Sequence, residues 1–305
     1  MKNNLYILQS EADGPLYPHF ACSAALRHIP LSVGRAALQA LHQELSVYPK
    51  PGLVTPFDSG SHDDMDAATF FRSLFALRSY FCEVALAGMQ GAPFSLLQRL
   101  GSEAEKRMLR ATGDVNTHRG AIFNLGLLAA GCGFLMGSGV SMEQGALGRL
   151  VCDRWGQTLL LHGESLPKTS HGSLVALRYG IGGAREEAAA GFPHLFELAL
   201  PELEHSLRLG MDMQVAAVQC LFRLISVMPD SNLLYRGGEE GLAFAQTAAR
   251  RFLDAGGVND PEWHTHAISI HRDFVARKLS PGGSADLLAA TLFVHRLLLM
   301  EKSLV

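Results

Sequence analysis

Long segments with one apolar helical face alternate with short polar connections along this chain. Over residues 66–87 the apolar positions recur at steps of three and four: Phe70, Leu74, Leu77, Phe81 and Val84. This spacing predicts a helix with Asp66 as its N-cap. Similar or weaker patterns predict helices over residues 31–47, 93–110, 119–136, 141–155, 184–199, 211–227, 238–255, 260–277 and 284–300.

The sequence has no clear run of alternating strand residues, no internal repeat and no linker long enough to demand two domains. We therefore predict an all-α fold, a single globular multi-helix domain of about a dozen helices over residues 31–305. Residues 1–30 carry Pro15, Pro18 and Pro30 with weak periodicity, which predicts an irregular N-terminal extension.

Residues 120–140 contain no charged residue, and the segment is long enough to cross a bilayer. The same segment holds six glycines together with Asn124 and Ser138. We interpret it as a buried core helix that packs closely through its glycines, so no membrane association is expected.

Composition narrows the function classes. The 305 residues are 48% hydrophobic and carry a formal net charge of −3, with acidic and basic residues well mixed. A nucleic-acid-binding surface would need a basic excess, so none is expected. The five cysteines form no CxxC pair and the start lacks a secretory signal, which favours buried thiols in a cytoplasmic protein.

Residues 49–66, PKPGLVTPFDSGSHDDMD, place four carboxylates within nine residues, with Lys50 and His62 nearby. Such carboxylates repel one another unless a cation neutralises them, and Mg²⁺ prefers oxygen ligands. Asp63, Asp64 and Asp66 are therefore candidate metal ligands. The alternative is a helix-capping cluster, which explains Asp66 and can include Asp64 but leaves Lys50 and His62 unexplained.

Residues 113–126, GDVNTHRGAIFNLG, place Asn116, His118 and Arg119 directly before the uncharged segment. An arginine fork and the N–H groups of a helix start can bind one phosphate together. A solvated loop with a capping side chain explains the same residues equally well.

Three further segments combine glycines with polar residues: 182–193 with Arg185 and Glu186, 230–241 with Asn232 and Arg236, and 279–291 with Ser280 and Ser284. The last resembles an anion-binding turn, although no GK[ST] follows it. An ordinary charged helix start explains residues 182–193 equally well.

Taken together, PKPGLV…GSHDDMD, NTHRGAIF, GAREEAAAGFP, NLLYRGGEEG and LSPGGSADLLAAT resemble the triphosphoribosyl-dephospho-CoA synthase family, in order and spacing. The resemblance runs from about residue 41 to residue 297 and is closer to the malonate decarboxylase branch than to the citrate lyase branch. It implies a transferase that makes the prosthetic-group precursor of an acyl-carrier subunit.

The resemblance implies that the 2′-hydroxyl of 3′-dephospho-CoA attacks the anomeric carbon of the ATP ribose. Adenine leaves, the triphosphate is retained and the configuration inverts, through a transition state with oxocarbenium character. ATP and 3′-dephospho-CoA are then the substrates, and Mg²⁺ or another divalent cation is the expected cofactor.

Under this hypothesis Asp63, Asp64 and Asp66 are general-base and metal candidates, and His62 and His118 are proton carriers or phosphate donors. The substrate and phosphate candidates are Lys50, Asn116, Arg119, Arg185, Glu186, Asn232, Arg236, Ser280 and Ser284. The downstream holo-acyl-carrier-protein synthase is a candidate protein partner, and a homodimer stays an open alternative.

Two other functions remain open at this point. His62-Asp63 also resembles the paired ligands of all-α metal-dependent phosphohydrolases, which need further His and Asp ligands on neighbouring helices. A non-catalytic adaptor for the acyl-carrier protein is the third interpretation.

Overall fold

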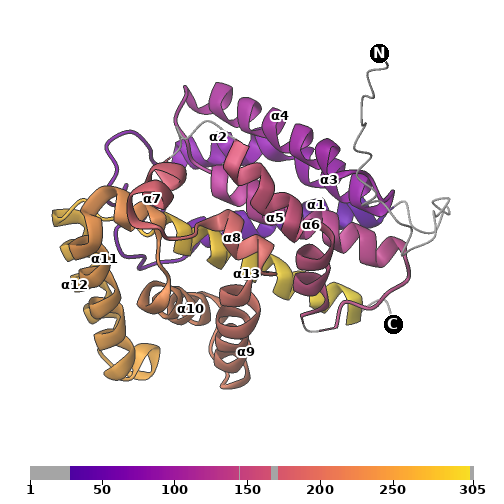
Figure 1. Cartoon of the computed structure of the whole chain (residues 1–305). Helices are drawn as coiled ribbons and strands as arrows, with labels where there is room; N and C mark the ends of the chain where they lie inside the picture. The colour runs from indigo at the N-terminus through magenta and orange to yellow at the C-terminus, as the bar shows by residue number, and fades with distance from the viewer. Residues whose placement is uncertain (1–27, 144, 166–170, 303–305) are drawn as a thin grey trace, which may run out of the picture.

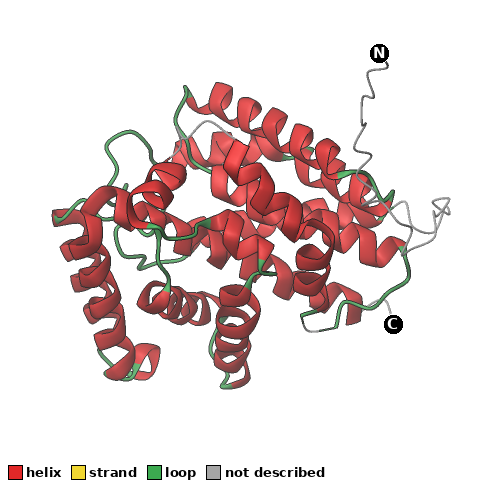
Figure 2. Ribbon diagram, in the orientation of Figure 1, coloured by secondary structure: helices red, strands yellow, loops and turns green. Residues whose placement is uncertain are grey.

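A computed structural model describes residues 28–143, 145–165 and 171–302, and in this part of the chain the regular structure is helical throughout (Figures 1 and 2). The helices are α1 (Ile29–Ser46), α2 (Ala67–Leu77), α3 (Tyr80–Met89), α4 (Phe94–Thr112), α5 (Arg119–Gly137), α6 (Ala146–Ser165), α7 (His171–Tyr179), α8 (Ala184–Ala189), α9 (Leu200–Arg208), α10 (Met213–Val227), α11 (Ser231–Asp254), α12 (Trp263–Ala276) and α13 (Gly282–Lys302). A π-helical turn, His194–Ala199, leads into α9, and a 3₁₀ turn, Gly257–Asn259, follows α11. The predicted all-α architecture of about a dozen helices is confirmed.

The single helix predicted over residues 66–87 is wrong, because the chain breaks between α2 and α3 at Arg78 and Ser79. The hydroxyl of Ser79 accepts a hydrogen bond from Arg107 of α4 at 2.8 Å. The buried apolar residues of α2, such as Leu77, are followed by those of α3, such as Phe81, at the same three- and four-residue steps. The apolar spacing therefore continues across the break. Asp66 is the N-cap of α2, as predicted.

Two other boundaries differ for reasons of backbone conformation. The helix predicted over residues 184–199 ends early because Gly191 and Phe192 adopt positive φ angles of 83° and 61°. In contrast, α11 begins seven residues before its predicted start and continues through a kink at Gly238, where φ is 62°.

Helices α7 and α9 are not predicted by the sequence. The predicted irregular extension over residues 1–30 is shorter than expected at its end, because α1 already includes Ile29 and Pro30. Residues 1–27 lie outside the described part.

Helix α5 lies in the core, packed against α1, α3, α4, α6 and α13 (Figure 1). A Cβ atom at Gly88 of α3 would overlap the carbonyl oxygen of Ala130, and one at Gly133 would overlap that of Ala85. Glycine at these positions therefore lets the two backbones touch. The predicted packing of this segment through glycines is confirmed.

Helices α5 and α13 are each long and apolar enough to cross a bilayer by length and composition. However, 83% of the apolar window of α5 and 56% of that of α13 is buried inside the protein. Other helices thus cover the apolar surface of α5, as expected of a core helix.

Candidate active site

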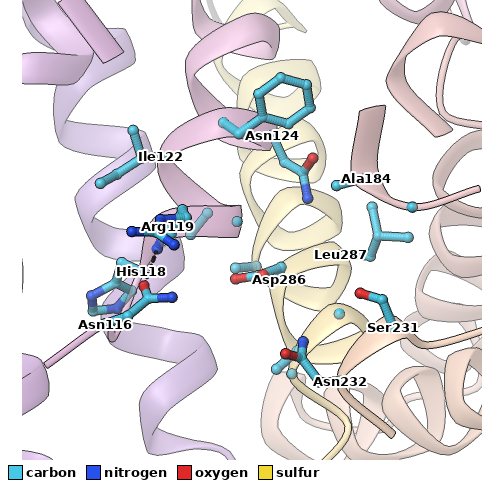
Figure 3. Close-up of a pocket in the computed structure, with 18 of the residues that line it drawn as sticks. Asn116, His118, Arg119, Ile122, Asn124, Ala184, Ser231, Asn232, Asp286 and Leu287 are labelled. Carbon is cyan, nitrogen blue, oxygen red and sulfur yellow. Dashed lines mark hydrogen bonds between the residues drawn. The ribbon is translucent and has the colours of Figure 1, made fainter. Parts of the chain in front are cut away.

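One large pocket of about 1460 Å³ collects residues from all five polar segments that the sequence singles out. Its lining includes His62 and Asp64, residues 116–124, residues 182–187, residues 230–232 with Arg236, and Ser280 with residues 285–287. Figure 3 shows side chains from α5, α8, α11 and α13 converging on this space. The prediction that the five segments share one cleft is confirmed.

The first turns of α5, α11 and α13 all contribute to the pocket wall. A helix N-terminus carries partial positive charge and N–H groups without partners in the helix. Side chains already accept several of these N–H groups, such as those of Arg119, Asn232 and Ser284. The dipoles of the three helix ends, together with the arginines of the pocket wall, still favour a ligand with negative charge, and a phosphate chain is the obvious class.

The three carboxylates proposed as metal ligands do not converge. Asp66 accepts hydrogen bonds from the backbone N–H and the hydroxyl of Thr69, at 2.8 and 2.7 Å, and these bonds lower its pKa. The side chain of Asp63 is 96% exposed and lies 3.8 Å from Nζ of Lys278. Of the three, Asp64 alone lines the pocket. Among the described residues no three His, Cys, Asp or Glu side chains are grouped to hold a metal ion.

His62 connects three of the polar segments. Its Nε2 lies 2.9 Å from Oγ of Ser280, and its Nδ1 lies 3.1 Å from the Arg236 guanidinium. Arginine can only donate, so Nδ1 accepts and Nε2 carries the proton that it donates to Ser280. Burial, reinforced by Arg236, lowers the pKa of His62. The imidazole is therefore neutral near pH 7 and holds the loops together.

Lys50 is fully buried and bound inside the protein. Its Nζ donates to the backbone carbonyl of Glu44 at 2.8 Å and to the Glu44 carboxylate at 2.7 Å. Burial lowers the pKa of Lys50, and Glu44 partly offsets that effect. Both residues line the pocket, but the ammonium group is already occupied by Glu44, which sequence reasoning did not identify.

His118 lies at the start of α5, and its Nδ1 is hydrogen-bonded to Oγ of Ser73 at 2.6 Å. Burial, with Lys50 nearby, lowers the pKa of His118 to about 3, so the ring is neutral at physiological pH. Its Nε2 and the Oδ1 of Asn124 are buried without a hydrogen-bond partner among the described residues. Both side chains line the pocket, which leaves two polar atoms for a ligand.

At the start of α5, Asn116 caps the helix and Arg119 forms an ion pair at the pocket wall. The Asn116 amide oxygen accepts the backbone N–H of Arg119 at 3.2 Å and so caps the helix (Figure 3). The guanidinium of Arg119 pairs with Glu105 of α4, to which its Nε donates at 2.6 Å. Its side chain is 43% exposed and lines the pocket, so the pair is open to a ligand.

The remaining predicted site residues either line the pocket or form hydrogen bonds that hold the helices together. Arg185, Glu186 and Asn232 line the pocket, although Glu186 also accepts the N–H of Gly183 at 2.7 Å and caps α8. Ser284 is buried and donates to Asp230 through its backbone N–H at 2.7 Å and its hydroxyl at 2.9 Å. Ser284 therefore joins α13 to the N-cap of α11.

Asp286 and Asn124 are pocket residues that the motif reasoning did not single out. Asp286 follows the glycine turn within LSPGGSAD and faces α5, where a Cβ at Gly120 would overlap its carboxylate. The available signal was a carboxylate and an amide in otherwise apolar helices, because buried polar residues need a partner or a function.

The all-α fold and this phosphate-suited pocket define a helical enzyme for a nucleotide-like substrate. A family model described as ATP:dephospho-CoA triphosphoribosyl transferase matches residues 30–303, and the chain belongs to this family and is a transferase.

Curated relatives of the chain carry names that describe the same activity as the family model. The chain is 40% identical over 275 residues to a probable 2-(5″-triphosphoribosyl)-3′-dephosphocoenzyme-A synthase of Acinetobacter calcoaceticus, covering 88% of this chain and 94% of the relative. It is 39% identical over 282 residues to the synthase of that name from Pectobacterium atrosepticum, covering 88% and 90%. No solved structure matches the chain.

Proposed function

We propose that this transferase moves the triphosphoribosyl group of ATP to the 2′-hydroxyl of 3′-dephospho-CoA and releases adenine. The observation that carries the proposal is the convergence of five separate polar segments on one pocket, in a chain of this family. The resemblance noted in the sequence supports an inverting displacement at the anomeric carbon.

The pocket is large for one small molecule. Its volume of about 1460 Å³ exceeds the roughly 300–1,000 Å³ usual for small-ligand sites. Besides the polar segments, its lining includes apolar side chains from α4 to α7: Phe94, Leu97, Phe123, Leu127, Leu160 and Leu177. Such a composition suits a phosphate-rich nucleotide and the less polar pantetheine arm of dephospho-CoA together.

The triphosphate is assigned to the helix starts and to three arginines of the pocket wall, Arg119, Arg185 and Arg236. A guanidinium binds two phosphate oxygens at once, so it fixes orientation as well as charge. Asn232 and Ser280 add further polar atoms to the pocket wall. Holding the phosphates in this way leaves the ribose carbon, not phosphorus, open to the nucleophile.

A divalent cation fits one part of this site. Mg²⁺ commonly uses one or two carboxylates together with substrate phosphates, and Asp64 is a pocket carboxylate near His62 and Arg236. We assign Asp64 as the protein ligand. When bound, Mg²⁺ neutralises phosphate charge, while Asp63 and Asp66 contribute to the surrounding field and the helix cap.

His118 and Asn124 are assigned to hydrogen-bonding of the nucleoside. A pKa of about 3 keeps the His118 imidazole neutral, so it serves as a fixed partner and not as a proton carrier at neutral pH. His118 Nε2 and Asn124 Oδ1, which have no hydrogen-bond partner in the described part of the chain, supply a ring nitrogen and an amide oxygen for ribose hydroxyls or the base.

The finer assignment is to malonate decarboxylase. We propose that the product becomes the prosthetic group of its acyl-carrier subunit, in the cytoplasm, after transfer by a holo-acyl-carrier-protein synthase. The support is the closer resemblance of the five motifs to that branch. Deleting the gene should abolish growth on malonate and spare growth on citrate; the reverse result assigns it to citrate lyase.

Incubation with ATP, 3′-dephospho-CoA and Mg²⁺ tests the reaction itself. Free adenine, formed only when both nucleotides are present, is the expected product. ADP or inorganic phosphate would instead indicate a phosphohydrolase, and no turnover would indicate an adaptor.

A further inference from the structure

Asp286 occupies an unusual position in the pocket. It projects from the first turns of α13 toward the start of α5, and it lies among the labelled pocket residues of Figure 3. The backbone N–H of Ala121 donates to its carboxylate. Gly120 makes this approach possible, because a Cβ there would overlap the carboxylate oxygen Oδ2.

The charged groups around Asp286 come from several elements. Glu44 of α1 and Asp230 before α11 bring negative charge, and burial together with these two carboxylates raises the pKa of Asp286 well above its usual value. Lys50 is paired with Glu44, while Arg119 at the start of α5 is paired with Glu105. His118, beside Arg119, is neutral at physiological pH. The nearby cations are thus engaged by other carboxylates.

Helix capping alone does not account for this placement. A capping aspartate is favoured in its ionised form, because the helix N-terminus attracts negative charge. The first N–H of α5 is already capped by Asn116. Asp230 satisfies its own carboxylate through Ser284 and the N–H groups of Asn232 and Leu233, so it is a scaffold residue. Within the described part of the chain, the Asp286 carboxylate accepts one hydrogen bond, from the N–H of Ala121, and Asp286 lines the pocket.

Departure of adenine from ribose requires a proton. As the bond between the anomeric carbon and N9 breaks, its electron pair moves onto the purine, and an adenine anion is a poor leaving group. A carboxylic acid held in its protonated form next to the bond is the usual solution in glycosyl transfer.

We infer that Asp286 is the catalytic residue that donates this proton to a ring nitrogen of the departing adenine. The inference rests on the proposed function. The 2′-oxygen of dephospho-CoA forms the new bond to the anomeric carbon as the bond to N9 breaks. The hydroxyl proton passes to solvent, and Asp286 regains a proton from solvent, so protons balance over one turnover.

A substrate that needs no proton separates this role from others. N7-methylated ATP carries a positive charge on its purine and leaves as a neutral base without protonation. We expect Asp286→Asn to lower kcat for release of adenine from ATP by about 10²- to 10⁴-fold, the usual range for acid catalysis. Release of methylated base should change little, and that retained rate also shows that the variant is folded.

Two controls keep the result decisive. Asp273→Asn changes an exposed carboxylate of α12 outside the pocket and should leave both rates unchanged. For the wild-type enzyme, kcat with ATP should fall at high pH as Asp286 ionises, whereas kcat with N7-methylated ATP should lack this alkaline decline. This second comparison needs no variant.

An equal loss of both rates in Asp286→Asn, or the same alkaline decline for both substrates, would overturn the assignment. A wild-type enzyme that releases neither base would instead refute the proposed function.

Discussion

His62 donates from Nε2 to the hydroxyl of Ser280 across 2.9 Å, although 218 positions separate the two residues in sequence. The contact fixes the loop before α2 against the turn before α13. Arg236 extends it by donating to Nδ1 of the same imidazole and to the backbone carbonyls of Ser61 and Lys278.

Ser280→Ala should remove the acceptor of that bond and leave a partly buried N–H unpaired. The expected cost is about 1–3 kcal/mol of unfolding free energy, measured by urea unfolding at neutral pH, with a raised KM for ATP. Ser46→Ala is the matched control, because the Ser46 hydroxyl donates to the His42 carbonyl of its own helix and Ser46 lies outside the pocket lining. Equal stability of both variants would mean that the contact contributes nothing.

Asp64→Asn should weaken Mg²⁺-dependent ATP binding by at least about tenfold, since it removes the pocket carboxylate assigned to the metal. Asp63→Asn is the control, because that carboxylate is 96% exposed and outside the pocket. Titration calorimetry with and without Mg²⁺ measures both. If the two variants bind alike, Asp64 is not the metal ligand.

Arg119→Lys should keep the positive charge and lose the planar fork. We expect a loss of about 1–3 kcal/mol of transition-state binding, or about tenfold to a hundredfold in kcat/KM for ATP, with unchanged far-ultraviolet circular dichroism. Arg119→Ala should lose more. Because Arg119 also pairs with Glu105, Glu105→Gln separates the two roles: it removes the partner but keeps the fork. A lysine variant with wild-type kinetics would reduce the role of Arg119 to charge.

The depressed pKa of His118 predicts a pH dependence of stability. Between its ordinary pKa of 6.5 and its folded value of about 3, the unfolded chain binds a proton that the folded protein does not. Stability must therefore fall as pH drops from 6.5 toward 3, by up to about 1.4 kcal/mol per pH unit from this group. His118→Asn should flatten the slope of unfolding free energy against pH, whereas an unchanged slope would exclude His118 as its source.

Leu160→Gln should raise KM for dephospho-CoA by about threefold to tenfold and leave KM for ATP unchanged, because it places an amide in the apolar part of the pocket. Leu161→Gln is a close control: it is also exposed, at 60%, and adjacent on α6, but it does not line the pocket. Equal effects of the two changes would place dephospho-CoA elsewhere.

Helix spacing predicts most of this fold, because burial of an apolar face is a local signal. It fails where a break leaves that face intact, as between Leu77 and Phe81, where both helices bury the same stripe. The apolar spacing also fails to predict the helix end at Phe192, because no sequence pattern indicates the positive φ of this residue. Both are tertiary effects that override local preference.

The candidate site follows a different rule. Sequence motifs identify which segments meet, and Arg119, Asn232 and Arg236 do line the pocket. They do not reveal which of these polar side chains are already engaged in hydrogen bonds or ion pairs within the protein. Lys50 is bound to Glu44 and Ser284 to Asp230, and such pairings between distant residues become visible only after folding.

The direct backbone contact of α3 and α5 at Gly88 and Gly133 has a dynamic consequence. Helices that meet through glycines have no intervening side chains to rearrange, so they move as one rigid body. Whatever opening admits two nucleotides and lets adenine escape must therefore come from elements outside this pair. Product release is then governed by motion of those elements, and we expect added viscogen to slow it while leaving single-turnover chemistry unchanged.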